Sequence, residues 1–194
     1  QRSLVGSEMC IRDRSLKGTF RLAVLPTIAP YLLPRFFQQL SEKHTDLDIR
    51  MLEMKTAPTM AALQNGEIDA AIIANQPTES NLQGDILYYE QFFGYVAHNE
   101  SIFKKDLIRT ADINDERLWL LDEGHCFRDQ LMRFCQMEKV KVRQAAYRLG
   151  SLETFMRMVE SGNGITFIPE LATLQLSKEQ KELVRPFALS LIHI

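Results

Sequence analysis

Short apolar runs alternate with segments of helical periodicity along this chain, and this alternation limits its possible folds more than any other feature. The run TFRLAVL at 19–25 predicts a buried strand, and apolar residues at helical spacing follow it. Further strands are predicted at 47–53, 67–74, 143–149 and 164–169, and helices at 31–39, 57–65 and from 152 onward. Strands that alternate with helices in this way indicate an α/β protein with largely parallel sheets.

The aromatic run ILYYEQFFGYVAH at 86–98 divides the pattern into two parts. We interpret it as an extended crossing segment, because a new set of strands and helices follows it. We therefore expect lobe I at 16–90 and lobe II at 91–189. Residues 1–15 and 190–194 are expected to be foreign to the fold, since both stretches resemble translated adapter sequence and the first has no apolar periodicity. We therefore exclude Cys10 from the candidate functional residues.

Composition argues against several classes of protein. The net charge is −2 and no helix face is rich in Lys and Arg, so a nucleic-acid surface is not expected. No apolar run approaches the roughly 18 residues that a membrane span requires. Three cysteines are too few for a disulfide scaffold, so we expect a soluble, reduced, cytoplasmic protein.

Cys126 and Cys135 lie nine residues apart in HCFRDQLMRFC, shortly after the apolar run WLL at 119–121. One continuous helix would hold their Cα atoms about 13 Å apart on opposite faces, whereas a disulfide requires about 7 Å or less. The two thiols therefore either never pair or pair only when the segment between them refolds. The second alternative would make this segment a two-state element of the kind that a switch requires.

The surroundings of the two cysteines differ in polarity. Cys126 lies beside His125, two residues before Arg128, and just before a predicted helix whose N-terminus favours an anion. These features predict a thiol of low pKa that peroxide would oxidise. Cys135 instead shares an apolar stripe with Phe127, Leu131 and Phe134, as a buried thiol does. The pattern fits a reactive cysteine whose sulfenic acid condenses with a second, sequestered one.

Less specific interpretations of the same residues remain open. Both cysteines also fit structural positions, and His125 fits a core or turn histidine. Arg128 and Asp129 fit the polar first turn of a helix. His125, Cys126 and Cys135 would offer a metal three donors, but their spacing is not that of a zinc site, so no metal site is expected.

At these residues the chain resembles the LysR-type transcriptional regulators, and GHCFRDQLMRFC is similar to the redox segment of their hydrogen-peroxide-sensing members. The resemblance extends over about 17–188 and includes LPTIAPYLLP, LQNGEIDAAI and GSLETFMRMVESGNGITFIP. It implies the effector-binding domain of that family, which is a two-lobed α/β fold of the periplasmic-binding-protein type 2 kind. It also implies a peroxide sensor that needs no cofactor.

The resemblance further implies roles for individual residues. Cys126 would be the peroxidatic cysteine and Cys135 the resolving one, and their disulfide would remodel the segment between them. Thr27 and Thr56 match hydroxyls around the peroxide, although each also fits a cap or turn position between a strand and a helix. The residues that would stabilise the thiolate and organise the pocket are His125, Arg128 and Asp129.

Partners follow from the same resemblance. They would be hydrogen peroxide, further copies of the chain in a dimer or tetramer, RNA polymerase, and a reductant of the glutaredoxin or thioredoxin type. No membrane is implied. Promoter DNA would be bound only through an N-terminal helix-turn-helix domain, which we do not find in this sequence, and the fold is expected to be C-terminally truncated.

Two other functions compete with the sensor. One is an effector domain that binds a small organic ligand between its lobes and whose cysteines are incidental. The other is an enzyme, either a cysteine hydrolase or a thiol peroxidase. A hydrolase needs a base and oxyanion donors around its nucleophile, and His125 is only a neighbour in sequence, so we do not expect an enzyme.

Overall fold

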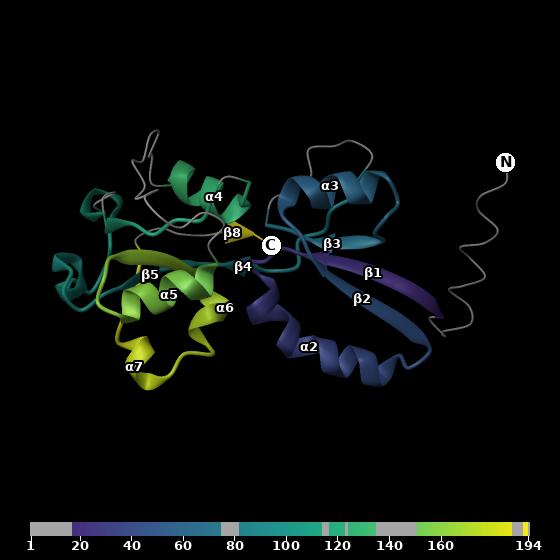
Figure 1. Ribbon diagram of the computed structural model, residues 1–194, viewed down its shortest axis with the longest axis horizontal. Coiled ribbons are helices and arrows are strands. Elements are labelled where there is room, and N and C mark those ends of the chain that lie inside the picture. The colour runs from purple at the N-terminus through teal and green to yellow at the C-terminus, as the bar shows by residue number, and fades with distance from the viewer. Residues whose placement is uncertain are drawn as a thin grey trace.

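The computed structural model describes residues 17–74, 82–113, 117–122, 124–134, 151–187 and 192–193. Two groups of strands and helices lie side by side, and the chain passes between them near β4 (Tyr89–Glu90) (Figure 1). This arrangement confirms the two-lobed α/β fold. The strand predicted at 143–149 lies outside the described residues.

Lobe I contains a parallel sheet of order β2-β1-β3, formed by β1 (Gly18–Val24), β2 (Leu47–Glu53) and β3 (Ala70–Ile72). Helices α2 (Ala29–Lys43) and α3 (Thr56–Gln64) cover its opposite faces (Figure 1). These elements confirm the predicted pattern, although β3 is shorter than expected. β1 and β2 each lead into a helix that packs back on the sheet, which is why the three strands run parallel.

Lobe II contains a second sheet of order β6-β5-β7, and its three strands are antiparallel. They are β5 (Phe92–Val96), β6 (Ile165–Pro169) and β7 (Val184–Pro186). The expectation of largely parallel sheets is therefore wrong for these strands. The reason is that β5 carries the chain into the lobe and β6 carries it back, so that Phe92 pairs with Pro169 at the junction.

The helices of lobe II lie on both sides of this sheet. In Figure 1, α4 lies above it, and α5, α6 and α7 lie below. The longest of these are α4 (Cys126–Phe134) and α5 (Leu152–Glu160), and the others are α6 (Glu170–Thr173), α7 (Lys178–Lys181), and the 3-10 turns η1 (Ser101–Lys104) and η2 (Thr110–Asp112). The Thr154 N–H donates to the Ser151 hydroxyl, which confirms the predicted cap of α5.

One hydrophobic core extends through both lobes, from Val24 and Tyr31 of lobe I to Phe92 and Phe127 of lobe II. The strand β8 (Ile192–His193) pairs with β4, although residues 190–194 are expected to lie outside the fold. An exposed strand edge pairs with any extended backbone, so this pairing needs no particular side chains. Within the described ranges, no helix is long and apolar enough to cross a membrane.

Candidate redox site

The carboxyl edge of the lobe I sheet brings three chain segments together. Val24 pairs with both Glu53 and Ile72, so the three strands end at the same level. Thr27, Thr56 and Ala74 follow these ends by two or three residues. Thr27 is buried, and Thr56 begins α3. Ligands commonly bind at this edge of an open α/β sheet.

Helix α4 of lobe II begins against this edge. Its first residue is Cys126, a free thiol that is 3% exposed. The first turn is closed by the Asp129 N–H, which donates to the His125 carbonyl at 3.2 Å. One turn later, the Gln130 side-chain amide donates to the Ala74 carbonyl at 2.7 Å. This bond ties the redox helix of lobe II to lobe I.

Three donors act on the Cys126 sulfur, yet burial has the larger effect. Desolvation raises the pKa of the thiol above its usual value, and the negative charge of Asp129 adds to the rise. The Thr56 hydroxyl and the N–H groups of Ala74 and Phe127 oppose it. The sequence-based prediction of a low pKa is therefore wrong for the reduced protein, because burial removes water from the sulfur.

The Thr56 hydroxyl differs from the two backbone donors, because it is a buried side-chain group with free hydrogen-bonding capacity. Its oxygen is buried and makes no hydrogen bond of ordinary geometry to any described residue. Its effect on the Cys126 sulfur is thus that of a nearby dipole rather than of a formed bond. A buried hydroxyl without a partner is costly, so a small oxygen-containing ligand at this position would be stabilised.

The charged residues beside Cys126 act differently from the sequence-based expectation. His125 is 8% exposed, and burial followed by the charge of Lys55 lowers its pKa, so the imidazole is uncharged at neutral pH. Asp129 raises the pKa of Cys126 and so disfavours the thiolate. Arg128 is half-buried on the first turn of α4. Asp129 therefore disfavours the thiolate in this state, and an uncharged His125 adds no positive charge beside it.

The sequence matches the family described as the LysR substrate binding domain over residues 13–193. This chain belongs to that LysR family. It is 34% identical over 157 residues to the "Probable hydrogen peroxide-inducible genes activator" of Mycobacterium leprae, a match that covers 81% of this chain and 50% of the relative. The chain thus spans about half the length of the curated relatives it matches.

Solved structures similar to this LysR-family domain include OxyR from Porphyromonas gingivalis, with 54% identity and a TM-score of 0.82. That match covers 91% of this chain and 83% of the other. Two further similar structures are the reduced and the oxidized form of OxyR. They are 28% identical, with TM-scores of 0.73 and 0.74, and each match covers 93% of this chain and 86% of the other.

Sequence reasoning missed three residues of the site in this LysR-family domain. Lys55 lies next to Thr56 and acts on His125 across the lobes, and Ala74 supplies backbone groups to both Cys126 and Gln130. Gln130 had a recognisable signal, because it lies four residues after Cys126 and so shares a helix face with it. Lys55 and Ala74 had none, since only the folded chain brings them close.

The described residues leave the second cysteine of the proposed pair untested and show no metal site. Cys135 lies outside them, so its predicted partnership with Cys126 remains a prediction. Among the residues that the LysR-family structure describes, no group of three or more His, Cys, Asp or Glu side chains is arranged to hold a metal ion.

Proposed function

We propose that this chain is the redox-sensing regulatory domain of a LysR-type transcriptional regulator that responds to hydrogen peroxide, with lobe I at 16–90 and lobe II at 91–189. The observation that carries the proposal is the position of the Cys126 sulfur. It lies buried where the two lobes meet, and the Thr56 hydroxyl and the N–H groups of Ala74 and Phe127 lower the pKa of its thiol. The names of the relatives agree with this chemistry.

The proposed chemistry has two balanced steps. The Cys126 sulfur attacks one peroxide oxygen, the O–O bond breaks, and the thiol proton leaves with the second oxygen as water. The resulting sulfenic acid then reacts with the Cys135 thiol, which forms the S–S bond and releases a second water. Thr27 and Thr56 hold the peroxide in the first step. The three donors stabilise negative charge that develops on sulfur as its proton departs.

The geometry of α4 couples this chemistry to a change of shape. The helix spans Cys126–Phe134, so eight steps of 1.5 Å hold the Cα atoms of these two residues about 12 Å apart. One further residue reaches at most about 3.8 Å, whereas a disulfide needs Cα atoms within about 7 Å. A bond from Cys126 to Cys135 therefore requires α4 to unwind. Unwinding would also break the bond between Gln130 and Ala74.

This role makes the domain a stoichiometric regulator rather than an enzyme. Oxidation changes how copies of the chain associate, and through them how DNA-binding domains sit on a promoter and contact RNA polymerase. A glutaredoxin or thioredoxin in the reducing cytoplasm returns the disulfide to thiols. Supporting this role, the relatives are named as gene activators.

The proposal is tested by adding a slight molar excess of hydrogen peroxide to the reduced protein. After digestion without reductant, mass spectrometry should find most of the protein as a linked Cys126–Cys135 peptide. Cys10→Ser is the matched control and should give the same product, whereas Cys126→Ser should give none. Over-oxidised Cys126 together with a free Cys135 would contradict the switch.

The Thr56 hydroxyl provides a second test. Thr56→Val removes the donor at nearly constant volume, so Cys126 should be oxidised about three- to tenfold more slowly, as expected for the loss of one hydrogen bond. Quenched-flow thiol counting measures this rate. Thr56→Ser restores the hydroxyl and should restore most of the rate. Equal rates for the wild type and Thr56→Val would remove this hydroxyl from the mechanism.

A further inference from the structure

Glu90 is a buried carboxyl group at the junction of the lobes. It lies on β4 and is 3% exposed. Its Oε1 accepts a hydrogen bond of 2.7 Å from the Leu171 N–H, at the start of α6. The salt bridges of the described residues include none to Glu90. A carboxylate buried without a cation is costly, so its surroundings favour the neutral acid.

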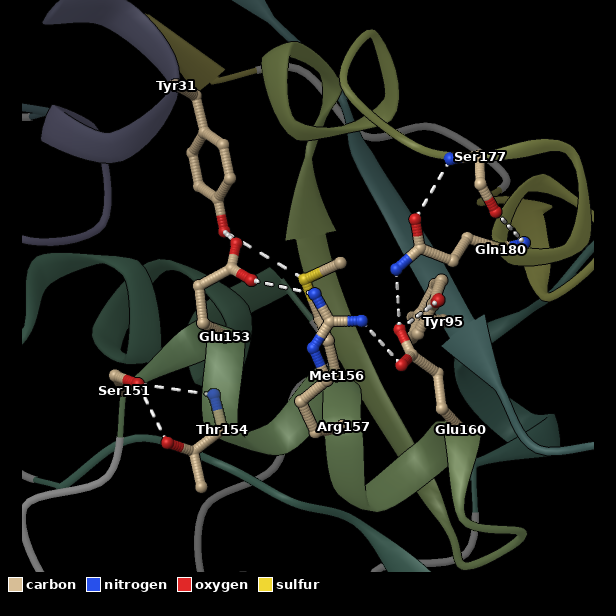
Figure 2. Close-up of polar contacts among 10 residues, drawn as sticks. All are labelled: Tyr31, Tyr95, Ser151, Glu153, Thr154, Met156, Arg157, Glu160, Ser177 and Gln180. Carbon is tan, nitrogen blue, oxygen red and sulfur yellow. Dashed lines mark hydrogen bonds and ion pairs between the residues drawn. The ribbon is translucent and has the colours of Figure 1, made fainter.

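Among the described residues, the ionisable groups that act on Glu90 are the phenols of Tyr88 and Tyr31 and the carboxyl group of Glu170. The strand β8, which pairs with β4, also carries His193, and this residue lies opposite Tyr89. Tyr88 of its own segment has a buried hydroxyl without a hydrogen bond of ordinary geometry to any described residue. From α2, the Tyr31 hydroxyl donates to Glu153 of α5 at 2.9 Å (Figure 2). From α6, Glu170 adds a negative charge. Arg157 of α5 pairs with Glu153 and Glu160 (Figure 2).

These surroundings move the titration of Glu90 into the neutral range. Burial raises the pKa of its carboxyl group to about 7, the Leu171 N–H opposes the rise, and the charge of Glu170 adds to it. The folded junction thus binds this proton more tightly than an open one. The carboxyl group contributes its full stabilisation to the folded state below its ordinary pKa of about 4.5. This stabilisation is lost as the pH rises through 7.

Glu90 is connected to α4 through two packed aromatic side chains. Alternate residues of an extended chain point the same way, so Glu90 and Phe92 share the buried side. The Phe92 ring meets the Phe127 ring edge-on, with centroids 4.8 Å apart and planes at 89°. Phe127 directly follows Cys126 on α4. A shift of Glu90 therefore reaches the redox helix through two packed rings.

We propose that Glu90 is a proton-operated positioning residue of the redox switch. The neutral carboxyl group holds β4 against α6 and keeps Phe92 packed on Phe127, whereas the ionised group loosens this junction and eases the unwinding of α4. The inference rests on the proposed function, because unwinding is what the disulfide requires. It makes the switch respond to pH as well as to peroxide, and it makes oxidation easier as pH rises.

Hydrogen exchange of the α4 amides tests the inference on the reduced protein at pH 6 and pH 8, after correction for intrinsic exchange rates. In the wild type, the opening equilibrium should increase by up to about tenfold between the two values. Glu90→Gln keeps the acceptor for Leu171 without the charge and should abolish the increase. The matched control Glu42→Gln changes an exposed carboxyl group of α2 and should keep the increase. An unchanged increase in Glu90→Gln would overturn the proposal.

A second measurement separates this inference from the peroxide chemistry. The same exchange experiment in a Cys126→Ser background involves no oxidation, so it gives its answer whether or not the protein senses peroxide. If Glu90→Gln does not fold, carbon-13 NMR of glutamate-labelled wild type measures the titration of the Glu90 carboxyl group directly. One carboxyl resonance should titrate near pH 7, and ordinary midpoints for all glutamates would overturn the inference.

Discussion

Replacing Gly164 with alanine should cost about 3 kcal/mol or more of folding free energy, because strain and a close backbone contact act together. Gly164 has a φ of +79°, which side chains other than hydrogen rarely tolerate. A Cβ added there would clash with the Arg117 carbonyl oxygen and would lie 2.7 Å from Nε1 of Trp119. The Gly164 N–H is also fixed, since it donates to Glu100 at 3.1 Å. Urea unfolding measures the loss.

The matched control for this substitution is Gly66→Ala. Gly66 has a similar φ of +70°, but an added Cβ would meet nothing within 4 Å. Only the conformational cost applies there, about 1 kcal/mol. Similar losses at both positions would show that backbone conformation dominates and that the close approach of Gly164 to Arg117 is relieved by small shifts.

The sequence predicts those parts of the fold that depend on local periodicity. The bounds of β2 and the cap of α5 agree with the prediction, because alternating apolar residues and a serine cap act over a few residues. The direction of the lobe II strands could not be predicted in the same way. It depends on which segments pair, and the partners of β5 lie at least 69 residues later in the chain.

The charge states of individual side chains in the site could likewise not be predicted from the sequence. The motif places Cys126 at a helix start, and the structure agrees. The prediction of a low pKa failed because it counted neighbours in the sequence, whereas folding removes the water around the sulfur. His125 illustrates the same point. Its charge state is set by burial and by Lys55, which precedes it by 70 residues.

Replacing Phe127 with alanine should destabilise the domain by about 3–5 kcal/mol, as expected for a buried aromatic side chain. Phe127 is 4% exposed and packs edge-on against Phe92. Phe127 follows Cys126 and belongs to the same hydrophobic core, so its loss should let water and reagent reach the thiol. The thiol should then react with a disulfide reagent at least about tenfold faster. Urea unfolding and the kinetics of thiol release measure the two effects.

Phe37→Ala is the matched control, because Phe37 lies on α2 and is 36% exposed. It should cost less than about 1 kcal/mol and leave the Cys126 rate unchanged. A thiol reaction that is as slow in Phe127→Ala as in the wild type would mean that residues other than Phe127 bury the sulfur.

The contact between Phe92 and Phe127 also links Glu90 to α4. In the Phe127→Ala background, Glu90→Gln should therefore no longer change the pH dependence of α4 opening. Persistence of that effect would require a route from Glu90 to α4 that bypasses these two rings.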